Sequence, residues 1–164
     1  MEPRTKENYD MDMPKPTAEH KRLEKLAGIW KGTEKMHPSP WAPKGSEAQA
    51  TTRSRVVVGG YAVAGDYEQR SGANVTFEGH AVYTWDPKAN QVVLHWFDSM
   101  GGGVDIFRGA WNGDKLLLQC QNVMGFCRMT TDLSKPGVMT SHMENSPDGK
   151  TWKPMMDGNY RRES

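Results

Sequence analysis

The sequence is poor in apolar residues, and it has no long apolar run. Apolar residues make up only 36% of its 164 residues, and the mean hydropathy is −0.77. No stretch approaches the roughly 20 consecutive apolar residues that a membrane-spanning helix needs, which excludes a helical transmembrane protein. The apolar content is also too low for the core of a solid helical bundle.

The sequence also lacks a charge of one sign. It contains 21 Lys and Arg against 20 Asp and Glu, a formal net charge of +1. A balanced chain has no general electrostatic reason to bind nucleic acid or an anionic membrane, so we expect neither as a partner. Its first residues, MEPRTKENYDMDMPKP, lack the apolar run of a secretory signal. We therefore expect a cytoplasmic protein.

Cysteine is scarce as well, with only Cys120 and Cys127. The two flank a predicted tight turn at residues 122–125, so a disulfide across the turn is geometrically conceivable. Because cytosolic thiols are normally kept reduced, we favour two small strand residues instead.

Aromatic residues, by contrast, are well represented at 9% of the chain. Disordered chains are depleted in them, so the sequence predicts a folded protein. Residues 1–16 combine charges of both signs with prolines and no apolar period, which indicates a flexible tail, and residues 17–164 form a single domain. Thr17 is a candidate N-cap for a short helix that ends at Gly28, with Leu23, Leu26 and Ala27 on one face. Such a helix is expected to cover or plug something.

From Ile29 onward the pattern changes to short runs of period two, separated by turn residues. Asn112-Gly113 predicts a two-residue hairpin, and three prolines in residues 37–45 predict a loop or lid. Closure leaves no unpaired strand edge, so we predict an all-β fold: an antiparallel up-and-down β-barrel of about ten strands with one short N-terminal helix. The predicted strands are residues 29–36, 52–58, 61–67, 75–85, 91–99, 104–111, 115–121, 126–130, 138–145 and 151–162.

Several separated motifs carry a family resemblance. They are PKPTAEHKRLEKLAGIWKG at residues 14–32, WFDSMGG at 96–102 and SPDGKTWKPMMDGNYRR at 146–162. Over roughly residues 13–162 the chain resembles a bacterial family of lipocalin-like, or calycin, barrels classed as a domain of unknown function. In calycins a Gly-x-Trp opens the first strand and a late basic residue covers the Trp. The resemblance implies that Arg161 or Arg162 covers Trp30, and it brings no established activity.

More distantly the chain is similar to nitrobindin-like barrels, which bind haem through a histidine near the start of the last strand. The comparable stretch here is KPMMDGNYR at residues 153–161, with a methionine where that group has its histidine. We therefore predict no cofactor, and haem held by the thioether of Met155 stays an alternative.

Three histidines, His80, His95 and His142, fall within predicted strands. Each lies on a separate strand without a second ligand at i+2 or i+4, so no metal site is predicted. If they point inward, they provide acid and base groups near neutral pH. Hydrogen bonding in the lumen and exposure to solvent are the two other roles open to them.

Other candidates come from strand alternation. Trp96 and Asp98 share one face, where Asp98 either orients a polar ligand end, acts as a base, or caps the following turn. Arg53, Arg55 and Arg108 could meet a ligand carboxylate, as inward arginines do in fatty-acid-binding barrels, although surface exposure is favoured. The many methionines between residues 100 and 156 predict an adaptable apolar wall rather than a copper or haem site.

Together these patterns predict binding of a small, mostly apolar or aromatic ligand in the barrel lumen. Two alternatives stay open, a small enzyme that uses a His/Asp pair in the lumen, with His95 or His142 near Asp98 or Glu144, and a haem-binding barrel. No residue is predicted as catalytic, and a homodimer is compatible with the sequence. The candidate contacts are Trp30, His80, His95, Trp96, Asp98, Arg108, His142 and Met155.

Overall fold

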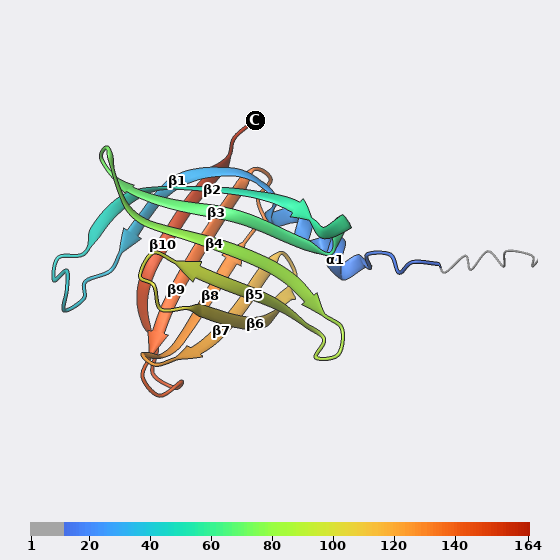
Figure 1. The fold of residues 1–164 in the computed structure, drawn as a ribbon. Coiled ribbons are helices and arrows are strands. Elements are labelled where there is room, and N and C mark those ends of the chain that lie inside the picture. The colour runs from blue at the N-terminus through green and yellow to red at the C-terminus, as the bar shows by residue number, and fades with distance from the viewer. Residues whose placement is uncertain (1–11) are drawn as a thin grey trace, which may run out of the picture.

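The computed structural model describes residues 12–164 and shows a closed antiparallel barrel of ten strands, which confirms the predicted fold (Figure 1). Each strand pairs with its neighbours in the sequence, and β1 pairs with β10 to close the ring. Residues 1–11 of the predicted tail lie outside the described residues. The strands are β1 Gly28–Met36, β2 Ser46–Val57, β3 Ala62–Ser71, β4 Asn74–Asp86, β5 Gln91–Asp98, β6 Val104–Asn112, β7 Lys115–Asn122, β8 Gly125–Asp132, β9 Val138–Ser146 and β10 Lys153–Arg162.

The helix is shorter than predicted and covers one end of the barrel. Thr17 caps α1 (Ala18–Leu23), and the chain then tightens into the 3₁₀ turn η1 (Glu24–Leu26). Leu23 and Leu26 are buried in the core beneath it. The helix is held at this end by Arg22, which donates to the carbonyl of Gly113 in the β6–β7 turn. None of the described helices is long and apolar enough to cross a membrane.

Alternation along each strand decides which side chains enter the barrel. On β5, Leu94 and Trp96 point inward, while His95 between them points outward. Inward side chains near α1 form a closed apolar core that includes Val63, Val92, Leu94, Phe107, Leu116 and Leu118. We call this part of the barrel the closed half.

Trp30 fills the base of β1 beside this core and is only 2% exposed. Its indole N–H donates to the carbonyl of Leu26 at 3.2 Å. The guanidinium of Arg162 lies 4.7 Å from the ring centroid. The basic residue that covers the tryptophan is therefore Arg162, which binds the first strand to the last.

Two of the predicted turns show how the ladders fix the connections. Asn112 pairs with Lys115 in the ladder, so the two-residue loop is Gly113-Asp114 rather than the predicted Asn112-Gly113. Only Gly113 of this group has a positive φ, of 60°. Residues 37–45 form the predicted loop between β1 and β2.

Candidate functional site

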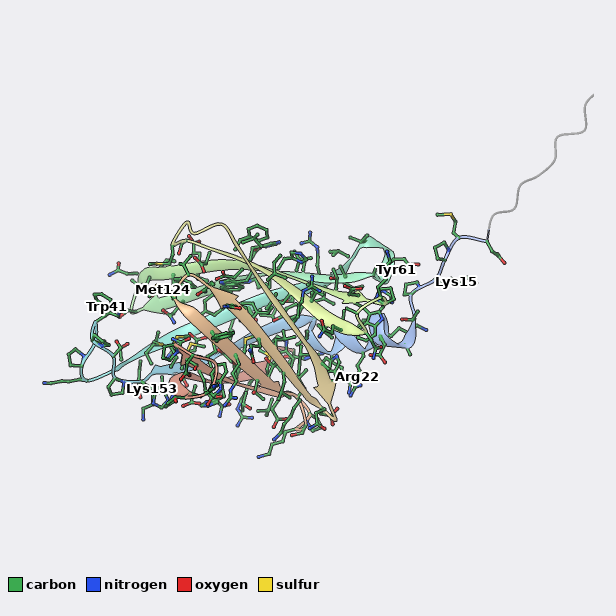
Figure 2. The ribbon with its side chains drawn as sticks, turned by 90° about the horizontal axis from the view of Figure 1, so that it is seen from below. Lys15, Arg22, Trp41, Tyr61, Met124 and Lys153 are labelled. Carbon is green, nitrogen blue, oxygen red and sulfur yellow. The ribbon has the colours of Figure 1, made fainter. Side chains whose placement is uncertain are left out.

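The end of the barrel opposite α1 is open. Because the strands run up and down in sequence order, the β1–β2, β3–β4, β5–β6, β7–β8 and β9–β10 connections all lie at this end. Figure 2 shows Trp41, Met124 and Lys153 at this end and Arg22 and Tyr61 at the other. Inward side chains at this end are only partly buried. Because the barrel wall lies between them and the outside, their exposed area faces the lumen. Solvent therefore enters this part of the lumen, which we call the open half.

One side of the open half is an aromatic wall formed by Tyr67, Phe77 and Trp96 on β3, β4 and β5. The rings of Tyr67 and Trp96 meet edge to face at 5.8 Å, and those of Phe77 and Trp96 stack at 6.4 Å. Trp96 also donates its indole N–H to Asp98 at 2.8 Å, which fixes the ring. Trp96 and Asp98 share one face of β5, as predicted, and the structure turns that face toward the lumen.

Gly79 makes room for this wall. It lies on β4 next to Asp98 of β5, and a Cβ added to it would fall 2.1 Å from the Trp96 ring. No side chain can occupy that space unless the indole moves. Gly79 is therefore part of the site although it contributes no side chain.

The other side of the open half is a row of methionines in lateral register. Met129 on β8 pairs with Met143 on β9, which pairs with Met156 on β10, which in turn pairs with Met36 on β1. In a ring of ten strands β9 lies opposite β4, so this methionine row faces the aromatic wall. Of the methionines predicted to form an apolar wall, Met129, Met143 and Met156 lie in this row, whereas Met100 and Met124 are exposed in connections between strands.

Met155 lies beside the row at an irregularity in the β9–β10 ladder. Its sulfur lies 2.9 Å from the side-chain nitrogen of Asn145. Among the described strands no histidine occupies an inward position, so the donors available to a metal in the open half are thioethers, thiols and carboxylates. This donor set does not fit a histidine-ligated haem of the nitrobindin type.

A buried carboxylate lies deep in the lumen, between the aromatic wall and the methionine row. Glu34 is 1% exposed, and its oxygens accept hydrogen bonds from Tyr67 at 2.5 Å, from Gln69 at 2.7 Å and from Tyr160. Gln69 also contacts the sulfur of Met36 at 3.8 Å, which connects this cluster to the methionine row. Burial, and then the charge of Glu34, raise the pKa of Tyr67 and Tyr160.

Among the described residues, the inward charged groups of the open half are all carboxylates. Asp98 and Asp105 lie on inward, half-buried positions of β5 and β6, and Glu34 lies below them. No lysine or arginine occupies an inward position among the described strand residues around them. The site therefore favours a neutral or cationic ligand over an anionic one.

The two cysteines also face the lumen, opposite each other in the β7–β8 ladder, and both are free. Burial, with the charge of Asp105, raises the pKa of Cys120 to about 11. Burial, then the neighbouring Cys120 and Asp105, raises that of Cys127 to about 12. Both are protonated at neutral pH.

We therefore expect both thiols to react slowly with iodoacetamide. At pH 7.5 the thiolate fraction, and with it the rate, should be at least about 100-fold below that of an ordinary cysteine. The rate should rise toward pH 11, and mass spectrometry of quenched samples measures it. The urea-unfolded protein is the control, and equal rates in the folded and unfolded protein would contradict the assignment.

Four of the predicted ligand contacts lie outside the barrel. His80 contacts Asp66 at 2.7 Å on the outer face, and Arg108 faces Asp86 at 3.4 Å. His95 pairs with Val82 and Ile106 on the outer face of β5, and His142 lies on the outer face of β9. All four point outward for the same reason: each lies one position along its strand from an inward residue, and adjacent strand residues point to opposite faces. Arg53 and Arg55 are likewise exposed.

His142 instead belongs to a groove of about 490 Å³ on the outside of the barrel. There the carboxylate of Asp157 contacts His142 and His37, each at 2.5 Å. These two contacts hold the pKa of Asp157 below the usual range. The second ring nitrogen of His142 lies 3.8 Å from Glu144, beyond hydrogen-bond distance. The histidine–carboxylate pair that the enzyme alternative requires in the lumen is therefore not formed by the described residues.

Comparisons with known proteins bear on the family and the fold. A family model described as protein of unknown function (DUF1579) matches residues 15–162, and no curated protein matches the chain. The crystal structure of Rv2717c from M. tuberculosis is similar, with a TM-score of 0.69 and 13% identity over 90% of this chain and 99% of that one. The S-type phycobiliprotein lyase CPES from Guillardia theta has a TM-score of 0.62 and 10% identity, over 90% and 94%.

Proposed function

The chain belongs to the DUF1579 family, which is defined without a function, and we propose from the site itself that the open half of the barrel binds a small, mostly apolar, planar aromatic molecule. The observation that carries this proposal is the aromatic wall facing the methionine row across a lumen that solvent enters. Trp96 and Met129 pack against the closed core at one end of these surfaces, and both stay partly exposed.

The two walls suit a planar ligand for different reasons. Stacked and edge-on aromatic contacts add about 0.5–1.5 kcal/mol to simple burial. Thioethers against a ring add about 0.3–1.5 kcal/mol, and the flexible methionine side chains adapt to the outline of the ligand. A planar molecule between the walls therefore gains on both of its faces.

The charges favour a neutral or cationic molecule within this class. The acidic groups of the open half would repel a carboxylate, and no arginine lies on an inward position of the described strands in this half to pair with it. This distinguishes the site from a fatty-acid site, where an inward arginine holds the carboxylate. One structural neighbour is a phycobiliprotein lyase, but at such low identity the likeness supports only the use of the same fold.

The experiment titrates the protein with N-phenyl-1-naphthylamine, a neutral planar fluorophore. Its fluorescence should rise on binding, and the sulfonated analogue 1-anilinonaphthalene-8-sulfonate should bind at least about 10-fold more weakly, because the two differ by one negative charge. Equal affinity for the two probes would overturn the charge preference. Failure of the neutral probe to bind would overturn the site.

Gly79→Ala locates the probe. The added methyl group displaces Trp96, so the affinity for the neutral probe should fall at least about 10-fold while the circular dichroism spectrum stays that of a barrel. Gly102→Ala is the matched control, because nothing lies within 4 Å of its added Cβ. If both variants bind the probe equally, it does not occupy the space between the walls.

A further inference from the structure

The connections around the open end carry apolar side chains that contact almost nothing. Trp41 in the β1–β2 loop is 90% exposed and Met100 in the β5–β6 loop is 80% exposed. Val123 and Met124 in the β7–β8 turn are 101% and 82% exposed. Figure 2 shows Trp41 and Met124 at the same end of the molecule. We call these four side chains the rim tips.

The three connections that carry the rim tips are almost uncharged. Residues 37–45, 99–103 and 123–124 contain one formally charged residue, Lys44, and no acidic one. At the remaining two connections of this end, residues 72–73 carry no charge, and Asp148 and Lys150 balance each other in residues 147–152. Exposed loop tips are usually polar. Uncharged tips with large apolar side chains therefore indicate contact with an apolar surface.

We propose that the rim tips insert into the surface of a lipid bilayer and place the open end of the barrel against it. Tryptophan and other large apolar side chains are favoured at the boundary between headgroups and acyl chains, where the indole N–H stays hydrated. The three connections that carry the rim tips contain no acidic residue, which avoids repulsion by anionic headgroups, and Lys44 adds a weak attraction.

A bilayer fits this arrangement better than a protein partner does. The rim tips stand on three separate connections around an opening, whereas a protein interface buries a continuous patch with a desolvated centre. A fluid surface accepts separate tips without matching their spacing. The balanced net charge predicted no membrane partner on electrostatic grounds, and the docking proposed here depends on insertion of apolar side chains instead.

The position of the rim also connects docking to the lumen. A mostly apolar ligand could then pass from the bilayer into the lumen through the open end of the barrel without crossing water. This last step rests on the proposed ligand site, whereas docking itself does not, because it needs only the rim tips.

The experiment measures co-sedimentation of the full chain, without ligand, with two kinds of vesicle. One is phosphatidylcholine alone, and the other contains about 30% phosphatidylglycerol, to resemble a natural anionic membrane. We expect binding to both, with less than about a threefold loss between 0.1 and 0.5 M salt, because insertion rather than charge drives it. No binding to either vesicle would overturn the proposal.

Variants test whether the rim tips cause the binding. Trp41→Ser and the double variant Val123→Ser with Met124→Ser should each lower the partition coefficient at least about 10-fold. Val58→Ser is the matched control, because Val58 is 71% exposed at the α1 end, and it should bind as the unaltered chain does. An equal loss in Val58→Ser would overturn the proposal.

Tryptophan depth supplies a second readout. Brominated lipids should quench part of the emission, and Trp41→Phe should abolish that quenching while it keeps most of the binding. If the chain instead forms a dimer that the rim variants dissolve, and vesicles do not bind it, the rim is an interface between copies and the proposal fails. Loss of probe binding with vesicle binding intact would overturn only the ligand site.

Discussion

Replacing Trp30 by alanine is expected to lower the free energy of unfolding by about 4 kcal/mol, the range found when a fully buried aromatic side chain is truncated. The loss has three parts in the structure. The indole is 2% exposed, its N–H donates to the carbonyl of Leu26, and its face carries the guanidinium of Arg162. Truncation leaves a cavity beneath a cation that has lost its aromatic partner.

Urea unfolding followed by circular dichroism measures the effect. Trp30→Phe should lose about half as much, since it keeps a ring but not the N–H donor. Trp41→Ala is the matched control, because the same residue type is 90% exposed there, and its change should stay within about 0.5 kcal/mol. If Trp30→Ala and Trp41→Ala cost the same, Trp30 does not hold the closed half together.

Replacing Glu34 by alanine is expected to cost about 3 kcal/mol, although a carboxylate is removed from an apolar interior. Its oxygens accept from Tyr67, Gln69 and Tyr160. Without them these donors are left in a buried space, and a buried donor without a partner costs about 1–3 kcal/mol. The remaining contact between Gln69 and Tyr67, at 3.2 Å, recovers part of that loss.

Glu34→Gln separates hydrogen bonding from volume. It keeps the shape and one acceptor oxygen, so about half of the loss should return in the same urea experiment. Glu47→Gln, exposed at the start of β2, is the control and should change little. An unfolding free energy of Glu34→Ala within 0.5 kcal/mol of the unaltered chain, a margin typical of surface substitutions, would show that the carboxylate is not needed.

The same cluster sets an alkaline limit on stability. The pKa values of Tyr67 and Tyr160 are raised in the folded chain, so their neutral forms contribute stability that is present below the ordinary tyrosine value and is lost as the pH rises beyond it.

The architecture could be predicted because it follows from local signals. Runs of period two, the prolines of residues 37–45 and the glycines of the turns each specify an element without reference to the rest of the chain. Whether His95 or Trp96 enters the lumen depends on register across β4, β5 and β6. A shift of one residue exchanges the two faces, and no short stretch of sequence fixes it.

Glu34 was not singled out, because a glutamate between threonine and lysine is typical of an exposed strand. Its partners come from β3 and β10, and Tyr160 is 126 residues away. One signal was available, since Glu34 lies four residues after Trp30 and alternation places both on the same face. Gly79 was missed for a related reason, because its role is visible only once the ring of Trp96 lies over it.

The pairing of β1 with β10 has a consequence for biosynthesis. The first strand cannot complete its ladder until the tenth has left the ribosome, since Trp30 pairs with Arg162 and Gly32 with Tyr160. During elongation both edges of the growing sheet stay unpaired. Glu34 lacks one of its hydrogen-bond donors until Tyr160 is synthesised near the end of translation. Such distant contacts slow folding and leave the nascent sheet exposed to aggregation. The sheet therefore keeps two unpaired edges, which can pair with other chains, until β10 pairs with β1.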